Sequence, residues 1–211
     1  MLTENRNAIS DNGLKLPLVE EFYTIQGEGF HTGKAAWFIR LGGCDVGCNW
    51  CDSRFSWDPS SHPLIETDIL IENALNSGAD SVVITGGEPL MWNLDYLCSG
   101  LKRHGIKTFI ETSGAYSLTG IWDWICLSPK SNMPPKKSIF AMADELKVII
   151  EKKEDFEWAE KQKIMVNERC RIYLQPEWSK FETILPFIIE YVKVNVKWSI
   201  SLQSHKFMHI P

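Results

Sequence analysis

The chain has 211 residues, of which 44% are hydrophobic and 23% are charged. This length suits a single domain, and the composition is that of an ordinary globular protein, which excludes the disordered, collagen-like and fibrous classes. Twenty-two basic against 27 acidic side chains give a net charge of −5. This balance argues against a large phosphate-binding surface, so we expect no nucleic acid partner.

The apolar segments of the chain are short. The longest apolar run, Ile184 to Ile189, has six residues and contains Pro186, whereas a membrane-spanning helix needs about 20. We therefore expect no membrane partner. Residues 1–6 lack the basic-then-apolar pattern of a secretory signal, which predicts a cytoplasmic protein. Residues 1–13 are polar and end in a turn-forming tripeptide, which predicts a flexible N-terminal arm followed by a single domain over residues 14–211.

Hydrophobic periodicity and turn residues predict alternating strands and helices along the chain. Thr67 is placed to cap a helix that Gly78 ends, and Asn93 is placed to cap a second helix that Gly105 ends. Further helices are expected near Asp155–Met165 and Phe181–Val192, and strands at Val19–Gln26, Ala35–Leu41, Ser81–Thr85, Ile106–Glu111, Trp124–Leu127, Leu146–Ile150, Arg171–Gln175 and Lys197–Leu202.

This alternation predicts an α/β fold in which helices cover a mostly parallel sheet and ligands bind at the carboxyl ends of the strands. About eight strands with only about four helices favour a small, incomplete and open (β/α) barrel. Two irregular stretches between strand ends, Asp52–Pro63 and Ser128–Ser138, are the candidates for active-site loops.

Three of the six cysteines, Cys44, Cys48 and Cys51, lie within eight residues. Thiolates are soft ligands that select zinc or iron–sulfur clusters, and a structural zinc site normally closes with four protein ligands. Three thiolates on a four-iron cubane leave one iron open, as a substrate-binding cluster requires. Two other interpretations remain open at this point: three buried small hydrophobes, and structural zinc with a distant fourth ligand. The remaining cysteines are isolated and are expected to be inert.

A second motif follows the strand that ends at Thr85. The sequence Gly86-Gly87-Glu88-Pro89 offers two positions without a side chain, where the backbone can approach a ligand closely, and a proline that stiffens the exit. By itself this motif is consistent with an ordinary strand-ending turn.

Together, these two motifs resemble the three-cysteine loop and the glycine-rich turn of radical S-adenosylmethionine (SAM) enzymes. The resemblance narrows to the 7-carboxy-7-deazaguanine synthase family through further pieces that occur in that family's order: Phe22 to Gly29, Arg40 to Cys44, Cys51-Asp52-Ser53, Glu111 to Gly114, Ser128-Pro129-Lys130, Leu174-Gln175-Pro176 and Ile210-Pro211. They extend from about residue 18 to the last residue.

The resemblance implies a ligand set and leaves the radical on the cofactor, with no catalytic side chain. A [4Fe-4S] cluster would bind Cys44, Cys48 and Cys51, and Mg²⁺ would bind Ser53. SAM would contact Trp50, Cys51, Asp52, Gly87, Glu88, Ser113, Ser128, Pro129, Lys130, Gln175, Pro176, Glu177 and Trp178. The substrate would contact Ile25, Gln26, Gly27, Glu28, Arg40, Thr85, His205 and the carboxylate of Pro211.

The implied reaction is the radical-mediated ring contraction of 6-carboxy-5,6,7,8-tetrahydropterin to 7-carboxy-7-deazaguanine with release of ammonia, in queuosine-type 7-deazapurine biosynthesis. The resemblance also implies a flavodoxin-like protein as the electron donor and a homodimer of this chain. The alternatives are an activase of glycyl-radical enzymes and a non-catalytic iron–sulfur or zinc module. Gln26, Arg40 and the terminal proline favour a small carboxylated substrate over a protein loop.

Overall fold

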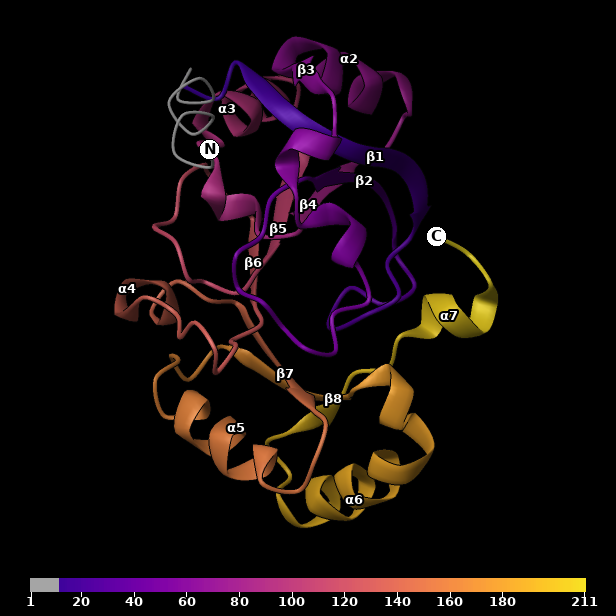
Figure 1. Ribbon diagram of the computed structural model, residues 1–211, viewed down its shortest axis with the longest axis vertical. Coiled ribbons are helices and arrows are strands. Elements are labelled where there is room, and N and C mark those ends of the chain that lie inside the picture. The colour runs from indigo at the N-terminus through magenta and orange to yellow at the C-terminus, as the bar shows by residue number, and fades with distance from the viewer. Residues whose placement is uncertain (1–11) are drawn as a thin grey trace.

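The computed structural model describes residues 12–211. Residues 1–11, which contain most of the predicted N-terminal arm, lie outside the described residues. The described chain forms one nine-stranded sheet with the strand order β3-β1-β2-β4-β5-β6-β7-β8-β9 (Figure 1). The first and last strands in this order are not paired with each other, so the sheet is an open barrel, as the sequence predicted.

The strands divide into an antiparallel edge and a parallel remainder. β1 (Lys15–Ile25) pairs antiparallel with β2 (Ala35–Leu41) and with the short β3 (Leu64–Glu66). From β2 onward every neighbouring pair is parallel. The parallel strands are β4 (Ser81–Gly86), β5 (Lys107–Thr112), β6 (Trp124–Leu127), β7 (Glu145–Ile150), β8 (Arg171–Pro176) and β9 (Ser199–Ile200). Their carboxyl ends therefore meet at one edge of the sheet.

Helices cover the outside of the sheet. They are α2 (Thr67–Asn76), α3 (Asp95–Arg103), α4 (Lys137–Phe140), α5 (Asp155–Lys163), α6 (Phe181–Val194) and α7 (Ser204–Met208). α3 packs against β5, α5 against β7 and α6 against β8. In Figure 1, α5 and α6 lie on the side of β7 and β8, while the long loop after β2 crosses the front of the barrel.

The helix ends follow the predicted glycines, but the helix starts differ. Gly78 and Gly105 take positive φ values of 71° and 77°, a conformation that favours glycine. Thr67 is the first residue of α2, not its cap, and its buried hydroxyl donates to the carbonyl of Gly13 instead. Asn93 lies one residue before the cap of α3, although its side chain still accepts from the amide of Asp95 at 2.9 Å.

Three short elements escaped the sequence analysis, and one predicted strand is shorter than expected. β3, α4 and α7 have three, four and five residues, too few for hydrophobic periodicity to register. The predicted strand Lys197–Leu202 contracts to the two residues of β9, and α7 follows it, so the chain does not run straight to Pro211.

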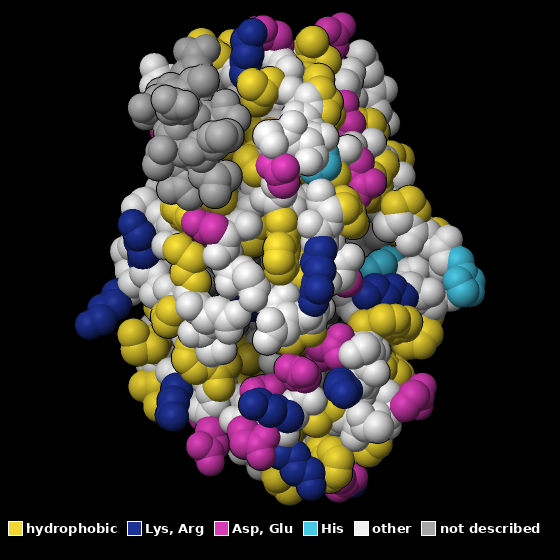
Figure 2. Space-filling view, viewed as in Figure 1, with side chains coloured by type: hydrophobic (Ala, Val, Ile, Leu, Met, Phe, Trp, Pro, Cys, Tyr) yellow, Lys and Arg dark blue, Asp and Glu magenta, His cyan; other side chains and the backbone are white. Residues whose placement is uncertain are grey.

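One main hydrophobic core joins the elements, from Leu16 on β1 to Trp198 just before β9. No helix among residues 12–211 is long and apolar enough to cross a membrane. Figure 2 shows acidic and basic side chains interspersed over the visible face, without a broad area of one sign.

Candidate active site

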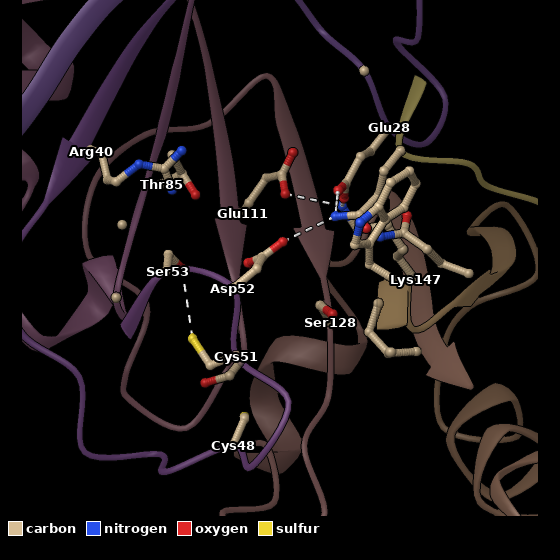
Figure 3. A pocket seen from close by; sticks show the side chains of 18 of the residues that line it. Glu28, Arg40, Cys48, Cys51, Asp52, Ser53, Thr85, Glu111, Ser128 and Lys147 are labelled. Atoms are coloured by element: carbon tan, nitrogen blue, oxygen red, sulfur yellow. Dashed lines mark hydrogen bonds and ion pairs between the residues drawn. The ribbon is translucent and has the colours of Figure 1, made fainter. Parts of the chain in front are cut away.

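A cavity of about 270 Å³ lies at the carboxyl ends of the parallel strands. Residues at or just after the ends of β4, β5, β6, β7 and β8 line it, together with the loop after β2 and the C-terminal segment. Figure 3 shows Cys48 and Cys51 at one margin of this cavity, Arg40 and Thr85 at a second, and Glu28 and Lys147 at a third. The fold thus brings residues from nearly the whole chain to one chamber.

Almost every residue singled out from the sequence lines this chamber, and Pro129, which is buried, is the exception. The lining residues from that set are Ile25, Gln26, Gly27, Glu28, Arg40, Cys44, Cys48, Trp50, Cys51, Asp52, Ser53, Thr85, Gly87, Glu88, Ser113, Ser128, Lys130, Gln175, Pro176, Glu177, Trp178, His205 and Pro211.

The three clustered cysteines form one wall of the chamber, and each is half-buried and unpaired. The loop that carries them is held at Cys44, whose amide donates to the carbonyl of Trp57 at 3.0 Å. The indole of the same tryptophan donates to the sulfur of Cys51 at 3.4 Å. Burial raises the pKa of Cys44 to about 11. The free thiol is therefore protonated at neutral pH, and binding of a metal must displace its proton.

The donor set of this wall fits an iron–sulfur cluster. Soft thiolates are the ligands of such clusters, and each thiolate in a cubane binds a different iron. The other three cysteines are buried and lie outside this wall.

The glycine-rich turn after β4 packs directly on the cysteine loop. A Cβ atom on Gly87 would overlap the carbonyl oxygen of Gly43 and would lie 2.6 Å from the Cβ of Cys44. The amide of Glu88 donates to the carbonyl of Gly43 at 2.8 Å. The absence of a side chain at Gly87 thus allows the glycine-rich turn to pack against the cysteine loop. From the sequence, Gly87 was expected to allow close approach of a ligand.

The Glu88 carboxylate is buried and accepts four hydrogen bonds within the protein. It accepts from the amide of Leu90 at 3.0 Å, from the hydroxyl of Thr112 at 2.5 Å, and from both the amide (2.8 Å) and the hydroxyl of Ser113. Because Thr112 and Ser113 lie at the end of β5, Glu88 ties the glycine-rich turn to the neighbouring strand. Its carboxylate orders the wall of the chamber.

A buried lysine holds two carboxylates on the opposite side of the chamber. Lys147 on β7 forms ion pairs with Glu28 and, at 3.0 Å, with Glu111, and its side chain is 3% exposed. Burial opposes a charge on Lys147, but the two carboxylates raise its pKa well above the usual value. Burial also works against ionised Glu28, yet the charge of Lys147 and its hydrogen bond lower the pKa of Glu28 to about 2. Lys147 and Glu28 therefore both carry charge at neutral pH.

Amide side chains extend this ionic group toward the cysteine wall. Gln26 donates to Glu111 at 2.9 Å, and its own amide oxygen accepts from the backbone of Glu28 at 3.1 Å. Gln203 donates to Glu28 at 2.8 Å and to Asp52 at 3.3 Å. Asp52 directly follows the last clustered cysteine. Through Gln203 it is connected by hydrogen bonds to Glu28, which is a predicted substrate ligand.

The remaining predicted ligands keep free bonding capacity. The Arg40 guanidinium donates from Nε to Glu20 at 2.7 Å, which leaves its other N–H groups for a ligand. The Ser53 hydroxyl lies 3.7 Å from the sulfur of Cys51. Lys130 donates to the hydroxyl and carbonyl of Ser128, and its ammonium lies 5.4 Å from the ring centre of Trp50.

Lys147, Glu111 and Gln203 are not among the ligands predicted from the sequence, although all three line the chamber. One signal was present: Lys147 is a lone charge inside the apolar strand predicted at Leu146–Ile150, and a buried charge needs partners. Its partners lie 119 and 36 residues away in sequence, so no local pattern identifies them.

Comparisons with known proteins agree with this geometry. A family model described as the radical SAM superfamily matches residues 38–131. The 7-carboxy-7-deazaguanine synthase of Flavobacterium psychrophilum is 53% identical over 211 residues, which are 100% of both chains. The enzyme of the same name from Synechocystis sp. is 45% identical over 194 residues, covering 92% of this chain and 93% of that one. The crystal structure of QueE from Escherichia coli matches with a TM-score of 0.81 and 30% identity, over 95% of this chain and 98% of that one.

Proposed function

Because this chain belongs to the 7-carboxy-7-deazaguanine synthase family of radical SAM enzymes, we propose that it converts 6-carboxy-5,6,7,8-tetrahydropterin to 7-carboxy-7-deazaguanine and ammonia. This activity is that of a carbon–nitrogen lyase in queuosine-type 7-deazapurine biosynthesis. The observation that carries the proposal is one chamber with a three-thiol wall on one side and the Glu28–Lys147–Glu111 group on another.

The family implies a [4Fe-4S] cluster, SAM and Mg²⁺ as cofactors. Cys44, Cys48 and Cys51 would hold three irons of the cluster and leave the fourth to SAM. Once bound, the cluster and SAM would supply the radical chemistry for abstraction of a hydrogen atom from the substrate. The protein binds the two ligands, orients them and shields them from water.

For SAM, we assign the surfaces that border the cysteine wall. The half-buried Trp50 ring, with the ammonium of Lys130 beside it, offers an aromatic face for the adenine. Gly87 and the polar groups after β6 and β8 complete this side of the chamber. Glu88 and Ser113, already bonded to each other, act as positioning residues for SAM.

For the pterin, we assign the opposite side of the chamber. The free N–H groups of Arg40 suit the substrate carboxylate, because a guanidinium binds a carboxylate with two parallel hydrogen bonds. Glu28 and Glu111 suit the N–H groups of the ring, while Thr85, His205 and Pro211 border the same space. Gln26 is largely committed to Glu111 and Glu28, which leaves it one N–H group for the substrate.

The remaining assignments follow from the family. We propose that Ser53 supplies one oxygen to Mg²⁺, with substrate oxygens and water completing the shell, since Mg²⁺ keeps several waters in such sites. A flavodoxin-like protein would donate the electron, residues 14–211 would act as one domain, and the enzyme would work as a cytoplasmic homodimer. The non-catalytic module and the glycyl-radical activase, the two alternatives left by the sequence, have no support from the named relatives.

An anaerobic assay tests the proposal directly. Reconstituted protein is incubated with a low-potential reductant, SAM, Mg²⁺ and the tetrahydropterin, and the products are identified by mass spectrometry. We expect 7-carboxy-7-deazaguanine and ammonia in equal amounts, and neither with Cys48→Ala. SAM cleavage without conversion of the pterin would refute the substrate assignment while leaving the radical SAM assignment in place.

A further inference from the structure

A second, much smaller cavity lies inside the barrel and shares a wall with the main chamber. Its volume, about 10 Å³, is room for the centre of one water molecule. Gln26, Glu28 and Glu111 line both cavities, so these side chains separate the small cavity from the substrate side. Among the residues on the far side of the small cavity are His31 and Glu145.

These two residues each bring a polar atom that lacks a partner. The Oε1 atom of Glu145 and the Nε2 atom of His31 are fully buried, and neither forms a hydrogen bond within the protein. An unpaired buried polar atom costs about 1–3 kcal/mol, so native structures satisfy such atoms with protein groups or with ordered water. Both residues line the small cavity, which has room for one water that could serve as a partner for these atoms.

The rest of the Glu145 side chain is held rigidly. Its Oε2 atom accepts from the amide of Phe30 at 3.2 Å and from the indole of Trp124 at 3.0 Å. A Cβ atom on Gly29 would overlap Oε1, so the bare glycine makes space for the carboxyl group. Glu145 itself is 3% exposed. Its position two residues before Lys147 on β7 directs both side chains to the barrel interior.

The buried surroundings of Glu145 oppose a negative charge on its carboxyl group. Burial raises its pKa, and the carboxylate of Glu111 adds to this, against the opposing charge of Lys147 and the two hydrogen bonds to Oε2. The one lysine among these groups is already shared by Glu28 and Glu111. Further titratable or charged groups lie near Glu145, namely Cys126, Cys170, Tyr173 and Arg171, the last being the register partner of Glu145 on β8. Lys34 and Lys107 lie near His31.

We propose that Glu145 and one internal water form a proton store beneath the substrate, connected to it through Glu111. This inference rests on the proposed function, because ammonia release requires protons. When a C–N bond breaks and its electron pair stays on nitrogen, the nitrogen must gain a proton. Glu145 gives its proton to the water, the water gives one to Glu111, and Glu111 gives one to the departing nitrogen.

Glu145 regains its proton from the substrate. Product and ammonia together contain the atoms of the substrate, so the protons that nitrogen gains equal those that the ring loses as the new five-membered ring becomes aromatic. A proton lost from the ring returns to Glu145 by the same three groups in reverse. His31 orients the water through Nε2, and its ring, stacked on Phe109 at 4.5 Å, is fixed in place.

The test compares the isosteric Glu145→Gln with the exposed control Glu168→Gln. We expect Glu145→Gln to lower kcat for product formation at least tenfold, with the KM for the pterin within twofold. We also expect kcat of the wild type to fall at alkaline pH, and this fall to be absent in Glu145→Gln. Glu168→Gln should match the wild type. The metal-free protein offers an independent readout: its infrared spectrum should contain the C=O band of a buried carboxylic acid, absent in Glu145→Gln.

A second variant separates the water from the carboxyl group. Cys126→Met places a larger side chain on the wall of the small cavity and displaces the water, and we expect the same loss of kcat with the carboxylic acid band retained. If the wild type makes the product and kcat in both variants stays within twofold, the proton store is wrong. If the wild type makes no product, the proposed function fails, whereas the infrared band still reports on Glu145.

Discussion

The backbone amide of Ser113 donates a 2.8 Å hydrogen bond to the buried carboxylate of Glu88. Through this bond the end of β5 holds the turn that packs on the cysteine loop. The position of the glycine-rich turn after β4 therefore depends on Ser113, which follows the neighbouring strand β5. This dependence does not require the side chain of Glu88 or of Ser113 to contact a ligand.

Replacing Glu88 by Gln tests this dependence. The NH₂ group of the introduced glutamine would face donors that now meet a carboxylate oxygen, and each lost hydrogen bond to a charged group costs about 1.5–3 kcal/mol. We expect a lower free energy of unfolding in denaturant titrations and a KM for SAM raised at least fivefold, with smaller change in the KM for the pterin. Equal increases in both KM values would contradict a specific role at the SAM side.

Replacing Cys48 by Ala removes one of the three thiolates that would hold the cluster. A lost thiolate leaves an iron without its protein ligand. We expect the anaerobically reconstituted variant to lack the broad visible absorbance of a [4Fe-4S] cluster and to cleave no SAM. The control is Cys170→Ala, a buried cysteine outside the cavity, which should retain both. A normal iron content in Cys48→Ala would overturn the ligand assignment.

Replacing Ser53 by Ala tests the magnesium assignment. A hydroxyl that completes a hard-cation shell with substrate oxygens makes a weak site, so activity should depend on added Mg²⁺. We expect the stimulation of kcat/KM by Mg²⁺ in the wild type to disappear in the variant, and SAM cleavage without substrate to stay unchanged. The same Mg²⁺ response in both proteins would place the ion elsewhere.

Replacing Lys147 by Met leaves two carboxylates without their shared cation. Removing one partner of a buried ion pair costs about 3–5 kcal/mol, so we expect the variant to lose that much free energy of unfolding at pH 7. Because the pKa of Glu28 falls from 4.5 to about 2 on folding, its contribution is complete above pH 4.5 and is lost as the pH drops toward 2. The difference between wild type and variant should shrink over that range.

A surface lysine provides the control for that measurement. Lys193, whose side chain is 63% exposed, pairs with Glu190 on α6. Exposed pairs contribute at most about 1 kcal/mol, so Lys193→Met should change the free energy of unfolding little at any pH. A loss in Lys147→Met as small as this would mean that water reaches the buried pair.

Deleting residues 209–211 tests the role of the C-terminal segment. Pro211 lines the chamber, and an oxygen of its carboxylate accepts from the Thr24 hydroxyl at 3.4 Å. Without it, the substrate side of the chamber opens to water, so we expect kcat/KM for the pterin to fall about tenfold, the equivalent of one lost hydrogen bond to a charged group. SAM cleavage without substrate should persist. An unchanged kcat/KM would exclude Pro211 from the substrate site.

Much of the fold follows from local patterns because each pattern reflects a local physical requirement. Gly78 and Gly105 end helices as predicted, since few other residues adopt positive φ easily. The parallel sheet follows from alternating apolar strands and amphipathic helices. By contrast, α7 has only five residues and no buried one, so it leaves no periodic signature.

The site likewise contains residues that short sequence motifs predict and residues that only the structure identifies. The cysteine loop and the glycine-rich turn are short continuous motifs, and their positions on the chamber wall follow from the carboxyl ends of the strands. Lys147 and Glu145 lie on β7 and Glu111 lies on β5, and their interactions depend on which side chains face them across the barrel. The charge of one strand residue cannot be interpreted until the opposite strands are in place, so these three required the structure.

The contact between Gly27 and Ser204 joins the first strand hairpin to the last helix, because both the amide and the hydroxyl of Ser204 donate to the carbonyl of Gly27. The two residues are 177 positions apart. A ribosome therefore releases the cysteine loop long before it makes the C-terminal segment that lines the chamber. The three thiols proposed to hold the cluster are thus present on the nascent chain while that side of the chamber is still open.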